Sequence, residues 1–308
     1  MNIIFFGSDD FAEAHLQALI GSHHNVPACV TQPDRPKGRG MKVADSPIKE
    51  CALKHKIPVL QPASLNDPAF IKSLKDLKSD IFVVVAYGKF LPPAVLNIPP
   101  CGALNVHASL LPKYRGAAPI NWAIINGERG TGLSIIKINE EIDAGDILAQ
   151  MNMKIEKDET AVTLRAKMIK EGPPFLLRTL SHLSSCHPRA QDRKGVTFAP
   201  KLTKEAGHIP WGKQAREISN LIRGLLPWPG AYTFYRGRLL KILKARVLDG
   251  DPAKAEPGTV CEIGKKGIVV SAGDGRVLVQ KVHLQDAKPM DAYQFVIGHK
   301  IEVGCQFE

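Results

Sequence analysis

The sequence predicts an α/β protein, with a Rossmann-like domain built on a mostly parallel sheet and a C-terminal domain built as an OB-like β-barrel. Two patterns lead to this prediction. Over roughly the first 180 residues, short apolar runs alternate with segments of helical spacing, as strands and crossover helices do. Beyond residue 200, short β-type runs are separated by Gly, Asp and Pro, as they are in small barrels.

The strands of the first domain are expected where apolar residues run without alternation, because parallel strands are buried on both faces. The clearest is Ile81–Ala86 (IFVVVA), and Met1–Phe6 leads into Gly7 as a strand leads into a helix. Further strands are expected at Val26–Thr31, Pro58–Leu60, Gly102–Val106 and Gly132–Ile138. Segments with helical spacing lie between the strands, at Phe11–Ile20, Pro47–Lys56, Ala69–Leu77 and Pro119–Ile125.

A change of pattern marks the boundary between the domains. The segment Ser181–Thr203 lacks strong periodicity and holds more bases than acids, so we expect a linker there. We place the first domain at residues 1–185, the linker at 186–207 and the barrel at 208–308. In the barrel domain a helix is expected at Lys213–Gly224, followed by strands at Ala231–Tyr235, Leu239–Leu248, Gly258–Ile263, Gly267–Ser271, Arg276–Lys281 and near His299–Val303.

Composition limits the class of protein. A chain of 308 residues is long for a single core, and its formal charge of +11 favours a polyanionic partner such as nucleic acid. The six cysteines show no CxxC pair or metal-ligand spacing, so we expect mostly buried thiols in a reducing compartment and no metal. The apolar run Ile3–Phe6 is too short for a signal peptide, and no apolar stretch approaches the roughly 20 residues of a membrane span. We expect a cytoplasmic monomer without membrane contact.

Asn105 and His107 lie at the end of an expected strand, where open α/β sheets place their ligands. Side chains two residues apart in an extended segment share a face, so this amide and this imidazole point to the same side. Together they could donate hydrogen bonds to a carbonyl oxygen that becomes negative during acyl transfer. The alternative is a polar pair that only caps the strand.

A carboxylate is expected near this pair. The turn Glu141–Asp146 follows the strand Gly132–Ile138, and either Asp143 or Asp146 could orient His107 and accept a proton. An ordinary Asp-Gly turn is the alternative. The first strand leads into Gly7-Ser8-Asp9-Asp10 rather than GxGxxG, and the chain has no P-loop, GxSxG or HExxH, so dinucleotide binding and these other chemistries are disfavoured.

The segments NVHASLLPKYRGAAPINWAIINGE and EIDAGDIL resemble the folate-dependent formyltransferases, which move a formyl group from 10-formyltetrahydrofolate to an amine. The resemblance is long and ungapped. It implies that Asn105, His107 and Asp143 are the catalytic residues, which favours Asp143 over Asp146. Asn105 and His107 would donate to the developing oxyanion, while Asp143 would stabilise protonated His107 and take the proton that the amine releases.

The same resemblance implies that 10-formyltetrahydrofolate is the cosubstrate. We expect it to lie along the end of the strand Ile81–Ala86 and along the loop after His107, where backbone groups can face the pterin. For the Tyr87 side chain, packing in the core is an equally weighted alternative. The expected folate-binding residues are Tyr87, Gly88, Ser109, Leu110, Leu111 and Pro112.

Three features resemble the branch of the family whose acceptor is initiator methionyl-tRNA. Thr31–Lys49 is similar to a basic loop that enters the acceptor arm of tRNA, and its expected tRNA contacts are Arg35, Lys37, Arg39 and Lys42. The segments APKLTKE and NLIRGLLPWPGAYT are similar to that branch's domain junction, and a barrel of about 100 residues follows. The alternatives are a formyltransferase for an amino sugar nucleotide, a folate hydrolase of similar fold, and a nucleic-acid-binding protein with an inactive folate domain.

Overall fold

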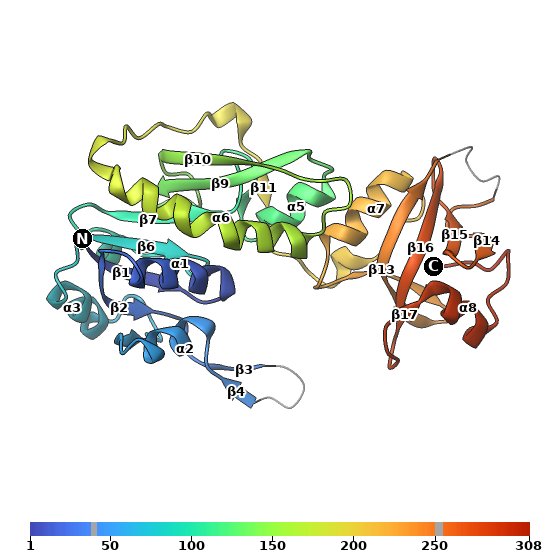
Figure 1. Ribbon diagram of the computed structural model, residues 1–308, viewed down its shortest axis with the longest axis horizontal. Coiled ribbons are helices and arrows are strands. Elements are labelled where there is room, and N and C mark those ends of the chain that lie inside the picture. The colour runs from blue at the N-terminus through green and yellow to red at the C-terminus, as the bar shows by residue number, and fades with distance from the viewer. Residues whose placement is uncertain (38–41, 250–254) are drawn as a thin grey trace. The chain divides into compact units, whose positions relative to one another are not determined.

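The computed structural model describes residues 1–37, 42–249 and 255–308, and the chain divides into two compact units (Figure 1). The first unit comprises Met1–Pro119, Thr131–Lys154 and Arg165–Pro200, and the second Ile120–Gly130, Ile155–Leu164 and Lys201–Glu308. This division differs from the expected one within the segment 186–207, because the residues up to Pro200 belong to the first unit.

A seven-stranded sheet forms the centre of the first unit, in the order β10-β9-β7-β6-β1-β2-β5. The neighbours from β7 to β5 are parallel, whereas β9 runs antiparallel to β7, so the predicted mostly parallel sheet is confirmed. The strands are β1 (Asn2–Gly7), β2 (Asn25–Val30), β5 (Val59–Leu60), β6 (Ile81–Val85), β7 (Ala103–His107), β9 (Gly130–Lys137) and β10 (Ile147–Lys154).

The helices of this unit begin at capping residues that the sequence displays. Asp9, Ser46 and Asp67 each accept a hydrogen bond from a backbone N–H in the first turn of the helix that follows. A proline stands at the start of two of these helices, where a missing N–H costs nothing. The helices are α1 (Asp10–Ile20), α2 (Pro47–Lys54), α3 (Pro68–Asp76), α4 (Pro93–Leu96) and α6 (Ala161–Ser181).

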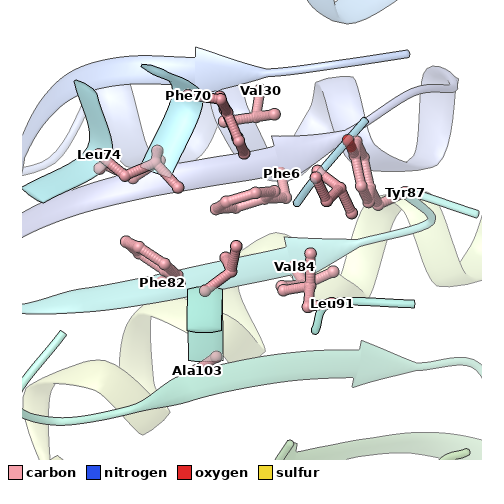
Figure 2. Packing of buried hydrophobic residues seen from close by; sticks show 12 residues of the cluster. Phe6, Val30, Phe70, Leu74, Phe82, Val84, Tyr87, Leu91 and Ala103 are labelled. Carbon is pink, nitrogen blue, oxygen red and sulfur yellow. The ribbon is translucent and has the colours of Figure 1, made fainter. Parts of the chain in front are cut away.

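A buried hydrophobic cluster with several aromatic rings covers one face of β1 and β6 (Figure 2). The ring centroids of Phe6 and Phe82 lie 5.1 Å apart, and those of Phe6 and Tyr87 lie 5.5 Å apart, edge to face. Phe70 of α3 covers the same cluster. Because Tyr87 lies two residues after the end of β6, its packing against Phe6 anchors the turn that follows this strand.

His15 is a buried histidine on α1 that gives the first unit a pH-dependent stability. Its Nδ1 contacts the Phe11 carbonyl oxygen at 2.7 Å, and its buried Nε2 has no partner within the described residues. Gly172 of α6 approaches so closely that a Cβ there would lie 2.6 Å from Nε2. Burial lowers the pKa of His15 from 6.5 to about 4.

In the unfolded chain His15 is therefore protonated below about pH 6.5, whereas in the folded chain it is protonated only below about pH 4. We expect stability to fall as pH drops through this window, by about 2–3 kcal/mol at its lower end. His15→Gln, which cannot titrate, should flatten the dependence. Urea unfolding at several pH values measures the difference, and equal slopes for the two proteins would show that His15 does not carry it.

The second unit contains an antiparallel sheet in the order β12-β13-β16-β15-β14, with β17 paired to β16. The C-terminal tail joins the two edge strands. Phe234 of β12 exchanges two backbone hydrogen bonds with Glu308, and Val260 of β14 bonds Gly304 and Cys305. The strands are β12 (Ala231–Tyr235), β13 (Arg238–Leu248), β14 (Val260–Gly264), β15 (Gly267–Ser271), β16 (Arg276–Leu284) and β17 (Met290–Asp291). The tail thus closes the sheet into a barrel, as predicted.

One predicted strand of this unit is wrong. The segment near His299–Val303 was expected to be extended, whereas helix α8 (Ala292–His299) ends there in a left-handed Lys300. Phe295 and Val296 lie on the buried face of α8, at the spacing of a helix. The run of short strands before this segment favoured a strand there instead. The other helices of the unit are α5 (Pro119–Ile125) and α7 (Ala215–Gly224).

The remaining elements are short. Two small sheets pair β3 (Arg35–Lys37) with β4 (Lys42–Ala44), and β8 (Arg115–Gly116) with β11 (Phe198–Ala199). Single 3₁₀ turns lie at Leu183–Ser185, Arg193–Gly195 and Glu205–Gly207. Within the described ranges, no helix is long and apolar enough to cross a membrane. All six cysteines are free, but only Cys29 and Cys51 are buried, so the expectation of mostly buried thiols was wrong.

Candidate active site

The end of β7 and the loop between β9 and β10 form the candidate site. Asn105 and His107 lie on β7, opposite Ile136 and Ser134 of β9. They point to the same face, because alternate residues of a strand do. Asp143 lies in the loop that joins β9 to β10, and this loop folds back onto the pair.

The carboxylate of Asp143 is shared by three groups. Asn105 Nδ2 donates to Oδ1 at 3.1 Å, and the backbone N–H of Gly116 donates to Oδ2 at 2.9 Å. His107 Nδ1 lies 3.4 Å from the same Oδ2. Asp146, the other carboxylate that the sequence offered, is exposed. The structure thus brings Asn105, His107 and Asp143 together.

Both ring nitrogens of His107 face acceptors. Nε2 lies 2.9 Å from the carbonyl oxygen of Tyr114, which can only accept, so Nε2 carries a hydrogen. A second proton on Nδ1 gives an imidazolium that faces the carboxylate of Asp143. The ring is buried, with 6% of its surface exposed, and the Asp143 side chain is 15% exposed. This arrangement holds the imidazole between the Tyr114 carbonyl oxygen and the Asp143 carboxylate at the edge of the site.

Two glycines allow the Asp143 loop and the segment around Gly116 to pack closely against neighbouring backbone. A Cβ on Gly145 would lie 1.7 Å from the carbonyl oxygen of Lys137, and a Cβ on Gly116 would lie 2.7 Å from that of Ala199. Asp143 itself has φ of +50°, a left-handed backbone that costs free energy outside glycine. The loop geometry is therefore held by its surroundings rather than by local preference.

The loop Ser109–Pro112, expected to bind folate, is held by two polar side chains. Ser134 Oγ donates to the Ser109 carbonyl oxygen at 2.7 Å and accepts from the Leu111 N–H at 3.0 Å. Gln150 Nε2 donates to the Leu111 carbonyl oxygen at 2.8 Å. Ser109 and Leu111 are buried, whereas Leu110 and Pro112 are partly exposed. The last two therefore offer the apolar surface of the loop.

Tyr87 and Gly88, the other expected folate contacts, differ in exposure. The Tyr87 side chain is 1% exposed, and its burial raises the pKa of its hydroxyl to about 12. Its carbonyl oxygen accepts from Ser8 and Gln32. Gly88 is exposed with φ of +74°, and Phe90 beside it is 51% exposed. At this turn, Gly88 and its neighbours rather than the Tyr87 ring face outward.

The four basic residues expected to contact tRNA lie on or beside the β3–β4 pair. The backbones of Arg35 and Lys37 are in β3 and that of Lys42 is in β4, whereas Arg39 lies outside the described residues. The side chains of the segment 35–44 also lie outside them. Lys49 binds Asp34 and Asp45, so an ion-pair network supports the base of this hairpin.

The segment 186–200 supplies site residues that sequence reasoning missed. Strand β11 pairs with β8, and Thr197 Oγ1 accepts from the Tyr114 N–H at 2.8 Å. Gln191 bonds the Asp143 loop and Arg115. The segment seemed a linker because it lacks periodicity, and only its isolated Gln and Thr could have hinted at fixed contacts.

No group of three or more His, Cys, Asp or Glu residues in the described ranges is arranged to hold a metal ion.

Comparison with known proteins gives the family of this site. Residues 1–180 match the formyl transferase family, and residues 201–300 match the formyl transferase C-terminal domain. The chain belongs to the formyl transferase family. It is 44% identical to a methionyl-tRNA formyltransferase of Acetivibrio thermocellus, over 99% of this chain and 98% of the relative. It is 45% identical to one of Caldanaerobacter subterraneus subsp. tengcongensis, over 99% of both chains.

Solved structures of other proteins share the fold. The sugar 3N-formyl transferase WlaRD, solved in the presence of dTDP and 5-N-formyl-THF, has a TM-score of 0.69 at 18% identity, covering 94% of this chain and 99% of its own. HypX from Aquifex aeolicus, solved with tetrahydrofolic acid, has a TM-score of 0.65 at 16% identity, covering 96% of this chain and 47% of its own. At these identities the likeness concerns the fold alone.

Proposed function

We propose that this chain transfers the formyl group of 10-formyltetrahydrofolate to the free α-amine of initiator methionyl-tRNA. The observation that carries the proposal is the full-length match, at 44–45% identity, to methionyl-tRNA formyltransferases. The clustering of Asn105, His107 and Asp143 supports it, because acyl transfer needs donors for an oxyanion beside a proton acceptor. We expect the enzyme to act as a cytoplasmic monomer.

The transfer makes one bond and breaks another. The amine nitrogen bonds the formyl carbon while the bond from that carbon to folate N10 breaks, and the amine loses a proton while N10 gains one. Asn105 Nδ2 has a second hydrogen beyond the one donated to Asp143, and it can donate this to the formyl oxygen. A protonated His107 can donate its Nδ1 hydrogen to the formyl oxygen as well, because Nδ1 lies 3.4 Å from Asp143 Oδ2, too far for a strong hydrogen bond to that oxygen alone. Asp143 stabilises that charge and accepts the proton of the amine.

The residues around the site fit a folate. The exposed Gly88 presents its backbone without a side chain, and the half-exposed Phe90 offers an apolar face beside it. A flat heteroaromatic ring with donor and acceptor edges requires this combination of apolar contact and backbone groups. Leu110 and Pro112, both partly exposed, offer further apolar surface in the loop that follows His107. We therefore retain Tyr87, Gly88 and Ser109–Pro112 as the proposed folate segments, with Tyr87 contributing through its backbone.

The positive charge of the chain suits a tRNA acceptor. The hairpin that carries Arg35, Lys37, Arg39 and Lys42 would neutralise phosphates of the acceptor arm. In the barrel, Arg236 lies over the Tyr235 ring at 5.2 Å, and Arg236 and Arg238 are exposed. We propose the catalytic role for residues 1–185 and tRNA binding for 208–308, while the segment 186–207 joins them.

The test is a direct comparison of acceptors. The purified chain is given 10-formyltetrahydrofolate with methionyl-initiator tRNA, with an amino sugar nucleotide, or with no acceptor. Formylated methionyl-tRNA should form with the first acceptor only. Faster formylation of the sugar nucleotide would support the main alternative, which the sugar formyl transferases of the same fold represent. Consumption of the folate at equal rates in all three mixtures would indicate a hydrolase.

A further inference from the structure

One amide side chain, that of Gln191, joins the two loops that meet at the reaction centre. Its Nε2 donates to the carbonyl oxygens of Asp143 and Gly145, at 2.8 Å each. Its Oε1 accepts from Arg115 Nε at 3.0 Å and from Nη2 at 2.7 Å. The residue after Arg115 is Gly116, whose N–H donates to the Asp143 carboxylate. Every hydrogen-bonding group of this amide therefore has a site partner.

A backbone bridge brings Gln191 to this place. Arg189 exchanges two backbone hydrogen bonds with Ile147, at 2.8 and 2.9 Å, directly after the Asp143 loop. Gln191 follows two residues later, so this bridge to the start of β10 fixes the backbone near Gln191. The four hydrogen bonds of the amide then set the position of its side chain.

Contacts to its backbone stabilise the conformation of the Asp143 loop. Asp143 has φ of +50°, in the left-handed region that most non-glycine residues avoid, although aspartate enters it more readily than most. The carbonyl that Gln191 binds belongs to the same residue as the carboxylate that contacts Asn105 and His107. If the peptide rotates, the carboxylate leaves its three partners.

Only an amide meets the requirements of this position. The two carbonyl oxygens need donors, while the Arg115 guanidinium needs an acceptor. If the amide were flipped, its oxygen would face the two carbonyl oxygens and its N–H groups would face the Arg115 guanidinium, so neither side could form hydrogen bonds. Glutamate would satisfy Arg115 but repel the carbonyls, and methionine would keep the shape while satisfying neither side.

We propose that Gln191 is a positioning residue for formyl transfer, which acts by holding the Asp143 carboxylate against Asn105 and His107. The inference rests on the proposed function for its kinetic consequence. Gln191 acts through the Asp143 loop and does not contact the substrates. The segment 186–200, which belongs to the first unit, is thereby a component of the reaction centre.

The first test compares kinetic constants. Gln191→Met should lower kcat for methionyl-tRNA formylation by about 10- to 100-fold, as loss of an orienting hydrogen-bond partner does at other sites. The KM values for tRNA and folate should change less than about threefold, because neither substrate contacts the amide. Gln191→Glu, which keeps the Arg115 contact and the fold, should lower kcat in the same way. Gln17→Ala, a glutamine change on the exposed face of α1, is the matched control.

A double-mutant cycle separates positioning from a general loss of structure. In an Asp143→Ala background no carboxylate remains to be positioned, so Gln191→Met should slow single-turnover transfer by less than about twofold. Enzyme in excess over labelled tRNA keeps such slow reactions measurable. The same 10- to 100-fold loss in both backgrounds would overturn the proposal, as would unchanged kcat for Gln191→Met and Gln191→Glu in wild-type enzyme.

A measurement without substrates keeps the inference distinct from the proposed function. The side-chain amide of Asn105 reports its bond to Asp143, and its NMR resonance should shift in Gln191→Met but not in Gln17→Ala. An unshifted resonance contradicts the positioning role whatever the enzyme formylates. If wild-type protein forms no formylmethionyl-tRNA, the proposed function fails while the resonance still decides the role of Gln191.

Discussion

Asn105→Ala and His107→Ala should each lower kcat for formyl transfer by about 10²–10³-fold, which is the usual loss for one oxyanion donor. The Asn105 variant lacks the side-chain amide that contacts Asp143, and the His107 variant lacks the ring held between Tyr114 and Asp143. The change should appear in kcat more than in either KM, because the negative oxygen exists only in the transition state.

Folding and folate binding provide the controls for these variants. Each should keep a folded far-ultraviolet circular dichroism spectrum and bind tetrahydrofolate within about threefold of wild type, since both side chains lie at a strand end. Alanine at the exposed Asp146 should leave kcat nearly unchanged. A folded Asn105→Ala or His107→Ala enzyme with more than about half of wild-type kcat would refute the assignment.

Neutralising the basic residues of the β3–β4 hairpin should lower kcat/KM for tRNA at low salt nearly as much as the catalytic substitutions lower kcat. Replacing Arg35, Lys37, Arg39 and Lys42 with Gln removes four charges from a segment proposed to contact tRNA phosphates. Since each phosphate contact contributes about 0.9 to the salt slope on a duplex, KM for tRNA should rise roughly 10²-fold at 50 mM salt. The slope of log(kcat/KM) against log[salt] should become shallower by about three to four.

The matched control neutralises four exposed lysines elsewhere in the first unit, at Lys54, Lys56, Lys75 and Lys78. It has the same net charge as the hairpin variant, so it measures the general effect of charge on tRNA attraction. An equal rise of KM in the two variants would show that the hairpin is an ordinary charged surface. Unchanged KM for folate in both would confirm that the cosubstrate site is intact.

The sequence predicted the strands that carry and flank the Asn105 and His107 pair. Uninterrupted apolar runs located β1 and β6, a strand was also predicted at β7, and alternation placed Asn105 and His107 on one face. The residues alone left Asp143 and Asp146 as alternatives. The resemblance favoured Asp143, and the structure shows its carboxylate beside His107 while Asp146 is exposed.

The parts that sequence reasoning missed depend on tertiary contacts. Helix α6 contains Pro173 and Pro174, which normally interrupt a helix, so its sequence does not predict a helix of this length. Arg165 near its start binds Asp9 and Asp10 of the first βα turn, far away in the sequence. The segment 186–200 likewise has no periodicity, because its order comes from pairing with β8 and from the contacts of Gln191.

The Asp143 carboxylate contacts both Asn105 and His107, so its replacement tests the proposed reaction centre most directly. Transfer of labelled formyl from 10-formyltetrahydrofolate to methionyl-initiator tRNA should be followed in a single turnover, with wild-type enzyme and with Asp143→Asn. We predict formylmethionyl-tRNA from wild type, and a rate about 10²-fold or more lower for Asp143→Asn with both substrates still bound. Equal rates for the two enzymes, or no product from wild type, would contradict the account.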